Sequence, residues 1–254
     1  MKRVLFFGMA LVACSAVLFA NPPQDDDVIS KFKQFSSQQL LDTGNYYRLQ
    51  GSVDTALICY SLLINTSMKD TDFEQQKRVV EAYNTSGAIY TFLCDYRTAY
   101  ECFIRALILS ERANHVSAMP KIYTNIGTIY YYFKKHDMAK LYYSKALDLY
   151  PDSTSIAGIL NNMGAIEVES GDKDSAFYFL NKALQISNLY DNSYLSCIQS
   201  NIAWFYQESK AYDSAYHYFR LSLSEAKKNN EVEIESEILS QLGKLFFEVN
   251  VRGF

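Results

Sequence analysis

The chain has 254 residues, of which 49% are hydrophobic and 20% are charged, with only 10 glycines and 4 prolines. This composition is too apolar for a disordered protein and too poor in turn residues for an all-β sandwich. The net charge is −4 and no basic stripe is present, so nucleic acid is not expected as a partner.

Residues 1–20 predict an export signal. Two basic residues precede an uncharged run, Val4 to Ala20, which is typical of a secretory signal peptide. Three outcomes fit this segment: cleavage after Ala20, lipidation of Cys14 in the sequence LVAC, which resembles a bacterial lipobox, or retention as a membrane anchor. Cleavage is favoured over lipidation because apolar residues follow Cys14. We therefore expect an exported protein, periplasmic or attached to the membrane of the cell envelope through its N-terminus.

Residues 21–36 are expected to form a linker or N-terminal cap, and residues 37–254 contain a repeated pattern. The pattern is a glycine followed by tyrosine at +3, alanine at +12, an aromatic residue at +16, alanine at +19 and proline at +24. One unit has all of these residues: Gly127, Tyr130, Ala139, Tyr143, Ala146 and Pro151. Most of the shared positions recur when the count begins at Gly44, Gly87, Gly164 or Ala203.

The spacing predicts a helical hairpin in each unit. The glycine allows two helices to approach closely, and the residues at +12, +16 and +19 share one face of the second helix. A short polar turn separates the two helices, as in Gly171 to Lys173. One hairpin cannot bury both of its faces, so neighbouring hairpins are expected to stack into a solenoid.

This pattern resembles the tetratricopeptide repeat family over roughly residues 37–254. The family's usual tryptophan in the first helix is replaced at all five positions, by Leu40, Tyr83, Tyr123, Leu160 and Gln199. The glycine positions lie 37 to 43 residues apart, against about 34 in the family, as in its extended kinesin-light-chain-like branch. The resemblance implies an all-α, right-handed α-solenoid with five repeats and the first helix of a sixth.

The sequence contains no recognisable catalytic or metal-binding motif. Phosphate-binding loops, zinc signatures and nucleophile elbows are absent, and the three histidines lie far apart. Outside the export segment the cysteines are Cys59, Cys94, Cys102 and Cys197, whose spacing fits no metal or redox site. We interpret them as buried thiols, although an oxidising compartment would permit a disulfide of undefined pairing. No enzyme activity, metal or cofactor is expected.

The resemblance implies that function lies on the concave surface formed by the first helices. Groove-facing residues are expected six and three positions before the glycine, and one, four and five positions after it. The residues three before it are Leu41, Asn84, Thr124, Asn161, Ser200 and Ser240. Asn84 and Asn161 could bind the backbone of an extended peptide or, with equal weight, bond neighbouring helices. The adjacent Asn125, Asn162 and Asn201 are expected to fix the packing between repeats.

Aromatic residues suggest a second feature of the groove. Trp204, the only tryptophan, follows the glycine position of its repeat, and Gln207 lies one turn later. With Tyr131 and Tyr132 of the third unit, they are candidates for a partner-binding lining. The alternative for Trp204 is packing against the adjacent first helix.

The segment QLGKLFFEVNVRGF at the end of the sequence repeats the first half of a unit. Gly243 takes the glycine position and Phe246 the +3 position, while the alanine at +12 would be residue 255. Leu245, Phe247 and Val251 lie off the main apolar stripe, and an uncovered apolar helix is unusual at the end of a solenoid. We expect either that the chain is a truncated form of a longer one or that this helix docks onto a partner or a second copy.

The sequence thus predicts an exported, non-catalytic scaffold that binds protein or extended peptide in its concave groove. An alternative is the N-terminal sensory array of a larger membrane-spanning signalling or transcriptional regulator.

Overall fold

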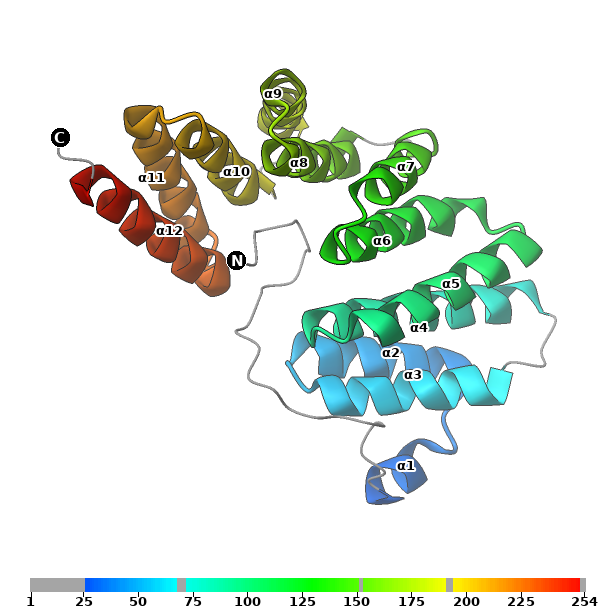
Figure 1. The fold of residues 1–254 in the computed structure, drawn as a ribbon. Coiled ribbons are helices and arrows are strands. Elements are labelled where there is room, and N and C mark those ends of the chain that lie inside the picture. The colour runs from blue at the N-terminus through cyan, green and yellow to red at the C-terminus, as the bar shows by residue number, and fades with distance from the viewer. Residues whose placement is uncertain (1–25, 68–71, 151–152, 191–193, 252–254) are drawn as a thin grey trace. The chain divides into compact units, whose positions relative to one another are not determined.

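The computed structural model describes residues 26–67, 72–150, 153–190 and 194–251. The predicted export signal, with Cys14, lies outside the described residues. Within these ranges the chain forms α-helices, one 3₁₀ helix and turns, with no strand (Figure 1). This confirms the predicted all-α fold built from stacked helical hairpins. None of the described helices combines the length and hydropathy needed to cross a membrane.

The described residues divide into two compact units, and residues 26–135 form the N-terminal unit. Its hairpins are α2 with α3 and α4 with α5, and α6 follows them (Figure 1). The helix bounds are α1 Asp26–Phe32, α2 Ser37–Leu49, α3 Val53–Ser67, α4 Phe73–Phe92, α5 Tyr96–Arg112, η1 Val116–Ala118 and α6 Met119–Tyr132.

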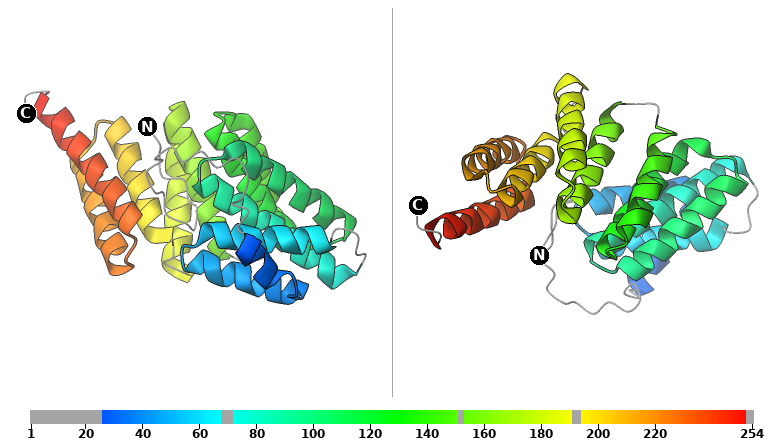
Figure 2. Two further views of the ribbon diagram at one scale, coloured as in Figure 1. Left: turned by 90° about the horizontal axis from the view of Figure 1, so that it is seen from below. Right: turned by 45° about the horizontal axis from the view of Figure 1, so that its top comes forward.

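The C-terminal unit comprises residues 136–251. Its hairpins are α8 with α9 and α10 with α11, and α12 lies beside α11 in both views of Figure 2. The helix bounds are α7 His136–Leu147, α8 Ser153–Ser170, α9 Lys173–Tyr190, α10 Leu195–Glu208, α11 Tyr212–Lys228 and α12 Val232–Val251.

Side-chain caps explain where several helices begin. Ser36 and Gln39 form a reciprocal capping box at the start of α2, each side chain accepting a hydrogen bond from the other's backbone N–H. Asp72 caps α4 by accepting a hydrogen bond from the backbone N–H of Gln75, and Asp95 caps α5 by accepting one from the backbone N–H of Thr98. These bonds satisfy amide groups that the first turn of a helix leaves without an internal partner.

Three of the repeat glycines lie where a first helix touches its second helix, as their spacing predicted. A Cβ atom on Gly87 would lie 2.6 Å from the ring of Phe103, and one on Gly44 would lie 2.6 Å from the ring of Tyr60. At Gly164 the corresponding neighbour is Leu180, at 2.7 Å. Each contact joins the glycine to the residue at +16, so a side chain at the glycine would force the hairpin apart.

The remaining repeat positions form the core of the hairpins. The alanines at +12 are fully buried, and the large residues at +16 are 0–1% exposed. The former are Ala56, Ala99, Ala139, Ala176 and Ala215, and the latter are Tyr60, Phe103, Tyr143, Leu180 and Phe219. Small and large side chains therefore alternate along the inner face of each second helix, which allows close packing.

The turn inside each hairpin contains one residue in the left-handed backbone region. Glycine occupies this place at Gly51 and Gly171, with φ of 77° and 82°. Cys94, Lys134 and Lys210 occupy it elsewhere, with φ of 59° to 62°. A side chain at such a position costs about 1–2 kcal/mol relative to the right-handed conformation.

Lys210→Gly is accordingly expected to raise the free energy of unfolding by up to about 1 kcal/mol, because glycine adopts positive φ without steric cost. Gln185→Gly, in the middle of α9, is the control and should lower it by about 0.5–1 kcal/mol. Thermal unfolding followed by circular dichroism measures both changes. An unchanged or lower melting temperature for Lys210→Gly would show that the turn carries no strain.

Candidate functional site

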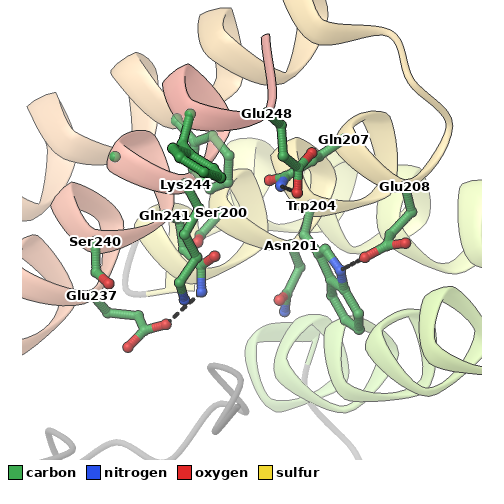
Figure 3. Close-up of a pocket in the computed structure, with 13 residues that line it drawn as sticks. Ser200, Asn201, Trp204, Gln207, Glu208, Glu237, Ser240, Gln241, Lys244 and Glu248 are labelled. Carbon is green, nitrogen blue, oxygen red and sulfur yellow. Dashed lines mark hydrogen bonds between the residues drawn. The ribbon is translucent and has the colours of Figure 1, made fainter. Parts of the chain in front are cut away.

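A groove of about 540 Å³ lies between α10 and α12 in the C-terminal unit (Figure 3). Ser200, Trp204 and Gln207 line it from α10, and Ser240, Lys244 and Phe247 line it from α12. Both helices are first helices of their repeats, so the groove lies on the surface where the sequence predicted partner binding. Two of the predicted binding residues, Trp204 and Gln207, are part of it.

Trp204 packs in an apolar cluster and also lines the groove, while its role in binding a partner stays a prediction. Its indole is half-buried and packs against an apolar cluster that includes Ile198 and Ile202, while it also lines the groove. The indole N–H donates a hydrogen bond of 2.9 Å to Glu208 Oε1 (Figure 3). The ring is therefore held in one orientation at the edge of the groove, as a binding surface requires.

The groove carries more acidic than basic side chains. Glu208, Glu237 and Glu248 line it together with one basic residue, Lys244. Gln207 Nε2 donates to Glu248 Oε1 at 3.2 Å, and Gln241 Nε2 donates to Glu237 Oε1 at 2.7 Å. These bonds position two carboxylates on the α12 wall, and Glu208 lies on the α10 wall, so the groove favours a cationic ligand that also has an apolar part.

A second groove, of about 410 Å³, lies in the N-terminal unit on α2, α4 and α6. Its charges are mixed: Lys77, Arg78 and Lys121 line it together with Glu74 and Glu81. Lys77 Nζ pairs with Glu74 Oε1 at 2.7 Å. Since opposite charges lie close together here, this groove selects less clearly for a charged ligand.

The predicted amides Asn84 and Asn161 bond to neighbouring first helices. Asn125 Nδ2 donates to Asn84 Oδ1 at 2.9 Å, and Asn201 Nδ2 donates to Asn161 Oδ1 at 3.0 Å. This matches the packing role expected for Asn125 and Asn201. Asn84 still lines the groove of the N-terminal unit, whereas Asn161 is completely buried. The side chain of Asn161 therefore contributes to packing in this structure and offers no surface to a partner.

The two predicted tyrosines make contacts within the N-terminal unit. Tyr131 is buried, and its ring lies 5.9 Å from that of Tyr132. Tyr132 stacks on Tyr96 with the ring centroids 4.4 Å apart, and burial raises the pKa of its hydroxyl. Trp204 belongs to the other unit, so an aromatic lining that combines all three rings stays a prediction.

All four described cysteines are free thiols. Cys59 and Cys197 are buried, which confirms their interpretation as packed thiols. Burial raises the pKa of Cys59 to about 11 and that of Cys197 to about 12, so neither favours the reactive thiolate. Cys94 and Cys102 are half-buried. Among the described residues no group of three or more histidine, cysteine and acidic side chains could hold a metal ion.

The charged residues of the α10–α12 groove were not among the binding residues predicted from the sequence. Glu237, Lys244 and Glu248 lie six before, one after and five after Gly243, at positions that the resemblance assigns to the groove. The repeat register could therefore have identified them. Glu208 lies five after Ala203, which takes the glycine position of its repeat, so the same register could have identified it too.

A family model for the tetratricopeptide repeat matches residues 78–152 and 119–189. This match supports the tetratricopeptide repeat pattern for the central stretch, and the glycine register extends the same pattern on both sides of it. No curated protein matches the sequence.

Several solved structures share the fold. A chain of the APC/C hetero-tetramer Cut9–Hcn1 matches 90% of this chain with a TM-score of 0.64 and 14% identity. This chain spans only 39% of that one. The apo form of RapI matches 85% of this chain and 82% of its own length, with a TM-score of 0.67 and 16% identity. BtubC from P. vanneervenii matches 81% of this chain and 92% of its own length, with a TM-score of 0.54 and 18% identity.

At these identities the likeness supports the fold alone. Neither the family model nor these structures indicate an enzyme family.

Proposed function

We propose that the protein is an exported, non-catalytic scaffold that binds a protein or an extended peptide in the groove between α10 and α12. The observation that carries this proposal is the oriented indole of Trp204 at the edge of an acidic groove formed by two first helices. The match of the central stretch to the tetratricopeptide repeat supports a role in protein interaction. Export is supported by the basic start and apolar run of residues 1–20.

The chemistry of the groove favours a peptide with lysine or arginine side chains. Carboxylates on both walls attract cations, and an indole face stabilises a nearby ammonium or guanidinium group by about 0.5–2 kcal/mol. Ser200 and Ser240 lie within the same groove and offer hydroxyl groups to a peptide backbone. An extended chain could therefore bind through its charge pattern without requiring one fixed sequence.

Three synthetic decapeptides that differ only in charge test this proposal: one with four lysines, one with four glutamates and one with four glutamines. We expect the lysine peptide alone to change the fluorescence of Trp204, which is the only tryptophan in the chain. The double variant Glu237→Gln/Glu248→Gln should weaken its binding at least tenfold, because the α12 wall loses both of its carboxylates. Fluorescence anisotropy of the labelled peptide measures the affinity of each variant.

Glu111→Gln is the matched control, since it removes an exposed carboxylate from α5 that does not line the groove. Its affinity for the lysine peptide should equal that of the unmodified protein. Equal binding of all three peptides, or equal loss in the control and the double variant, would mean that the groove does not select cations. Failure of Trp204→Ala to weaken binding would remove the indole from the site.

A further inference from the structure

A pocket of about 380 Å³ lies in the N-terminal unit, between α4 and α5 at the end of α3. Its charge distinguishes it from the two grooves described above, because its described lining contains Arg105 and Arg112 and no acidic residue. We call it the arginine pocket. Val79, Ile108 and Leu109 supply most of its apolar lining. Apolar walls with a few charged or hydrogen-bonding groups are typical of pockets that bind small molecules.

Helical spacing brings the lining residues together from two helices of one hairpin. On each helix they follow one another at intervals of three or four residues, so each set shares one face. Arg105 and Arg112 are seven residues apart, which separates them by about 10 Å along α5. The guanidinium carbon of Arg105 lies 5.9 Å from the centroid of the Tyr83 ring, within range of a cation–π contact. The two sets are Gln76, Val79 and Tyr83 on α4, and Arg105, Ile108 and Arg112 on α5.

Ile108 departs from the repeat pattern at this site. It lies 21 residues after Gly87, and its side chain is 43% exposed. The other four repeats form the same kind of unit with a polar residue here, so the repeat pattern does not require isoleucine at this position. Single exposed apolar residues are common on protein surfaces, but this one lies in a pocket between two arginines. The residues at the same position of the other repeats are all exposed: Asn65, Asp148, Gln185 and Ser224.

The two arginines have positive charge available for a ligand. Neither takes part in an ion pair with another residue of the described part of this unit. A guanidinium group can donate two parallel hydrogen bonds to a carboxylate or a phosphate. The pocket also contains the hydroxyl group of Ser67 and the amide of Gln76, which can bind further oxygen atoms of such a group.

We propose that the arginine pocket binds a small amphiphilic anion, with a carboxylate or phosphate head that pairs with the arginines and an apolar body that contacts Val79, Ile108 and Leu109. Charge complementarity identifies the head, since the charged residues of the described lining are all positive. The exposed isoleucine identifies the body, because it offers apolar contact where the other repeats are polar. This site goes beyond the proposed function, since it lies in the other unit and has the opposite charge to the α10–α12 groove.

Octanoate is a suitable probe, because it combines a carboxylate with an unbranched apolar chain. Isothermal titration calorimetry of the 254-residue protein compares it with octyl phosphate, octanol and octylammonium, which have the same chain. We expect both anions to bind, and we expect octanol and octylammonium to bind at least tenfold more weakly. Tighter binding of either anion supports the proposal and identifies the preferred head group.

Variants of α5 test the two parts of the pocket separately. Arg105→Gln/Arg112→Gln should weaken octanoate binding at least tenfold, because the head group loses both cationic partners. Ile108→Asn introduces the residue that the first repeat has at this position, and it should weaken binding about threefold or more by removing apolar contact. All three positions are exposed, so the helix should be retained, and circular dichroism checks this.

Two control variants separate binding in the arginine pocket from other effects. Arg97→Gln/Arg220→Gln removes the same charge from exposed arginines that do not line the pocket, so it should bind octanoate normally. Trp204→Ala should also bind normally, which distinguishes this site from the α10–α12 groove. The proposal is overturned if octanoate and octanol bind equally, if neither anion binds at millimolar concentration, or if the two arginine double variants lose the same affinity.

Discussion

Phe103→Ala is expected to lower the free energy of unfolding of the N-terminal unit by about 3–5 kcal/mol, the usual cost of removing a buried aromatic side chain. Phe103 is completely buried, and its ring edge lies against the backbone of Gly87. The substitution removes apolar contact and leaves a cavity between α4 and α5. Because repeat proteins depend on contacts between neighbours, the loss should spread from this hairpin to adjacent helices.

Substituting Gly87, which contacts the Phe103 ring, tests the same packing more specifically. Gly87→Ala should destabilise the protein by about 1–3 kcal/mol, because the new methyl group would overlap the Phe103 ring. In the Phe103→Ala background the ring is gone, and the same change should stabilise α4 by up to about 1 kcal/mol through its higher helix propensity. The sign of the effect therefore reverses between the two backgrounds. Gly243→Ala, which has open space around it, should stabilise the protein in either background.

Urea unfolding followed by circular dichroism measures these changes, and hydrogen exchange of α4 and α5 localises them. Hydrogen exchange is needed because unfolding of a repeat array need not be a single two-state transition. If Gly87→Ala had the same effect with and without the Phe103 ring, the glycine would not be required by the ring contact.

The hairpin packing could be predicted from the sequence because it depends on spacing alone. Residues at +12, +16 and +19 share one helix face whatever their rotamers, so the contact of Gly87 with Phe103 follows from their separation. The left-handed backbone of the turn residues was harder to predict from the sequence. Cys94, Lys134 and Lys210 adopt the left-handed backbone that glycine adopts elsewhere, and their side chains give no sign of it.

The direction of polar side chains could not be predicted in the same way. The sequence placed Asn84 and Asn161 near the groove, but it could not decide whether an amide points to a ligand or to a neighbouring helix. That choice depends on the distance between two first helices about 40 residues apart. For Trp204, packing in an apolar cluster and lining the groove proved compatible, since the half-buried ring does both.

Asn201→Ala is expected to lower the free energy of unfolding by about 1–3 kcal/mol, because it leaves a buried polar group without its hydrogen-bond partner. Asn161 is completely buried, and its Oδ1 accepts the Nδ2 hydrogen bond of Asn201. Removing the donor leaves this oxygen, on a side chain that is 0% exposed in the intact protein, without its hydrogen-bond partner. The double variant Asn161→Ala/Asn201→Ala should cost less than the sum of the two single variants, because it removes both partners of the bond.

The N-terminal unit provides a matched control for this effect. The Asn125–Asn84 bond has the same geometry, but Asn125 is half-buried and Asn84 borders a groove that water can enter. Asn125→Ala should therefore cost about 1 kcal/mol or less, since water can replace the missing donor. Hydrogen exchange in α8 and α10 for the first variant, and in α4 and α6 for the second, measures both costs. Equal costs at the two sites would show that burial of the acceptor does not determine the value of the bond. A larger cost at Asn201 would identify the interior bond as the one that holds neighbouring first helices in register.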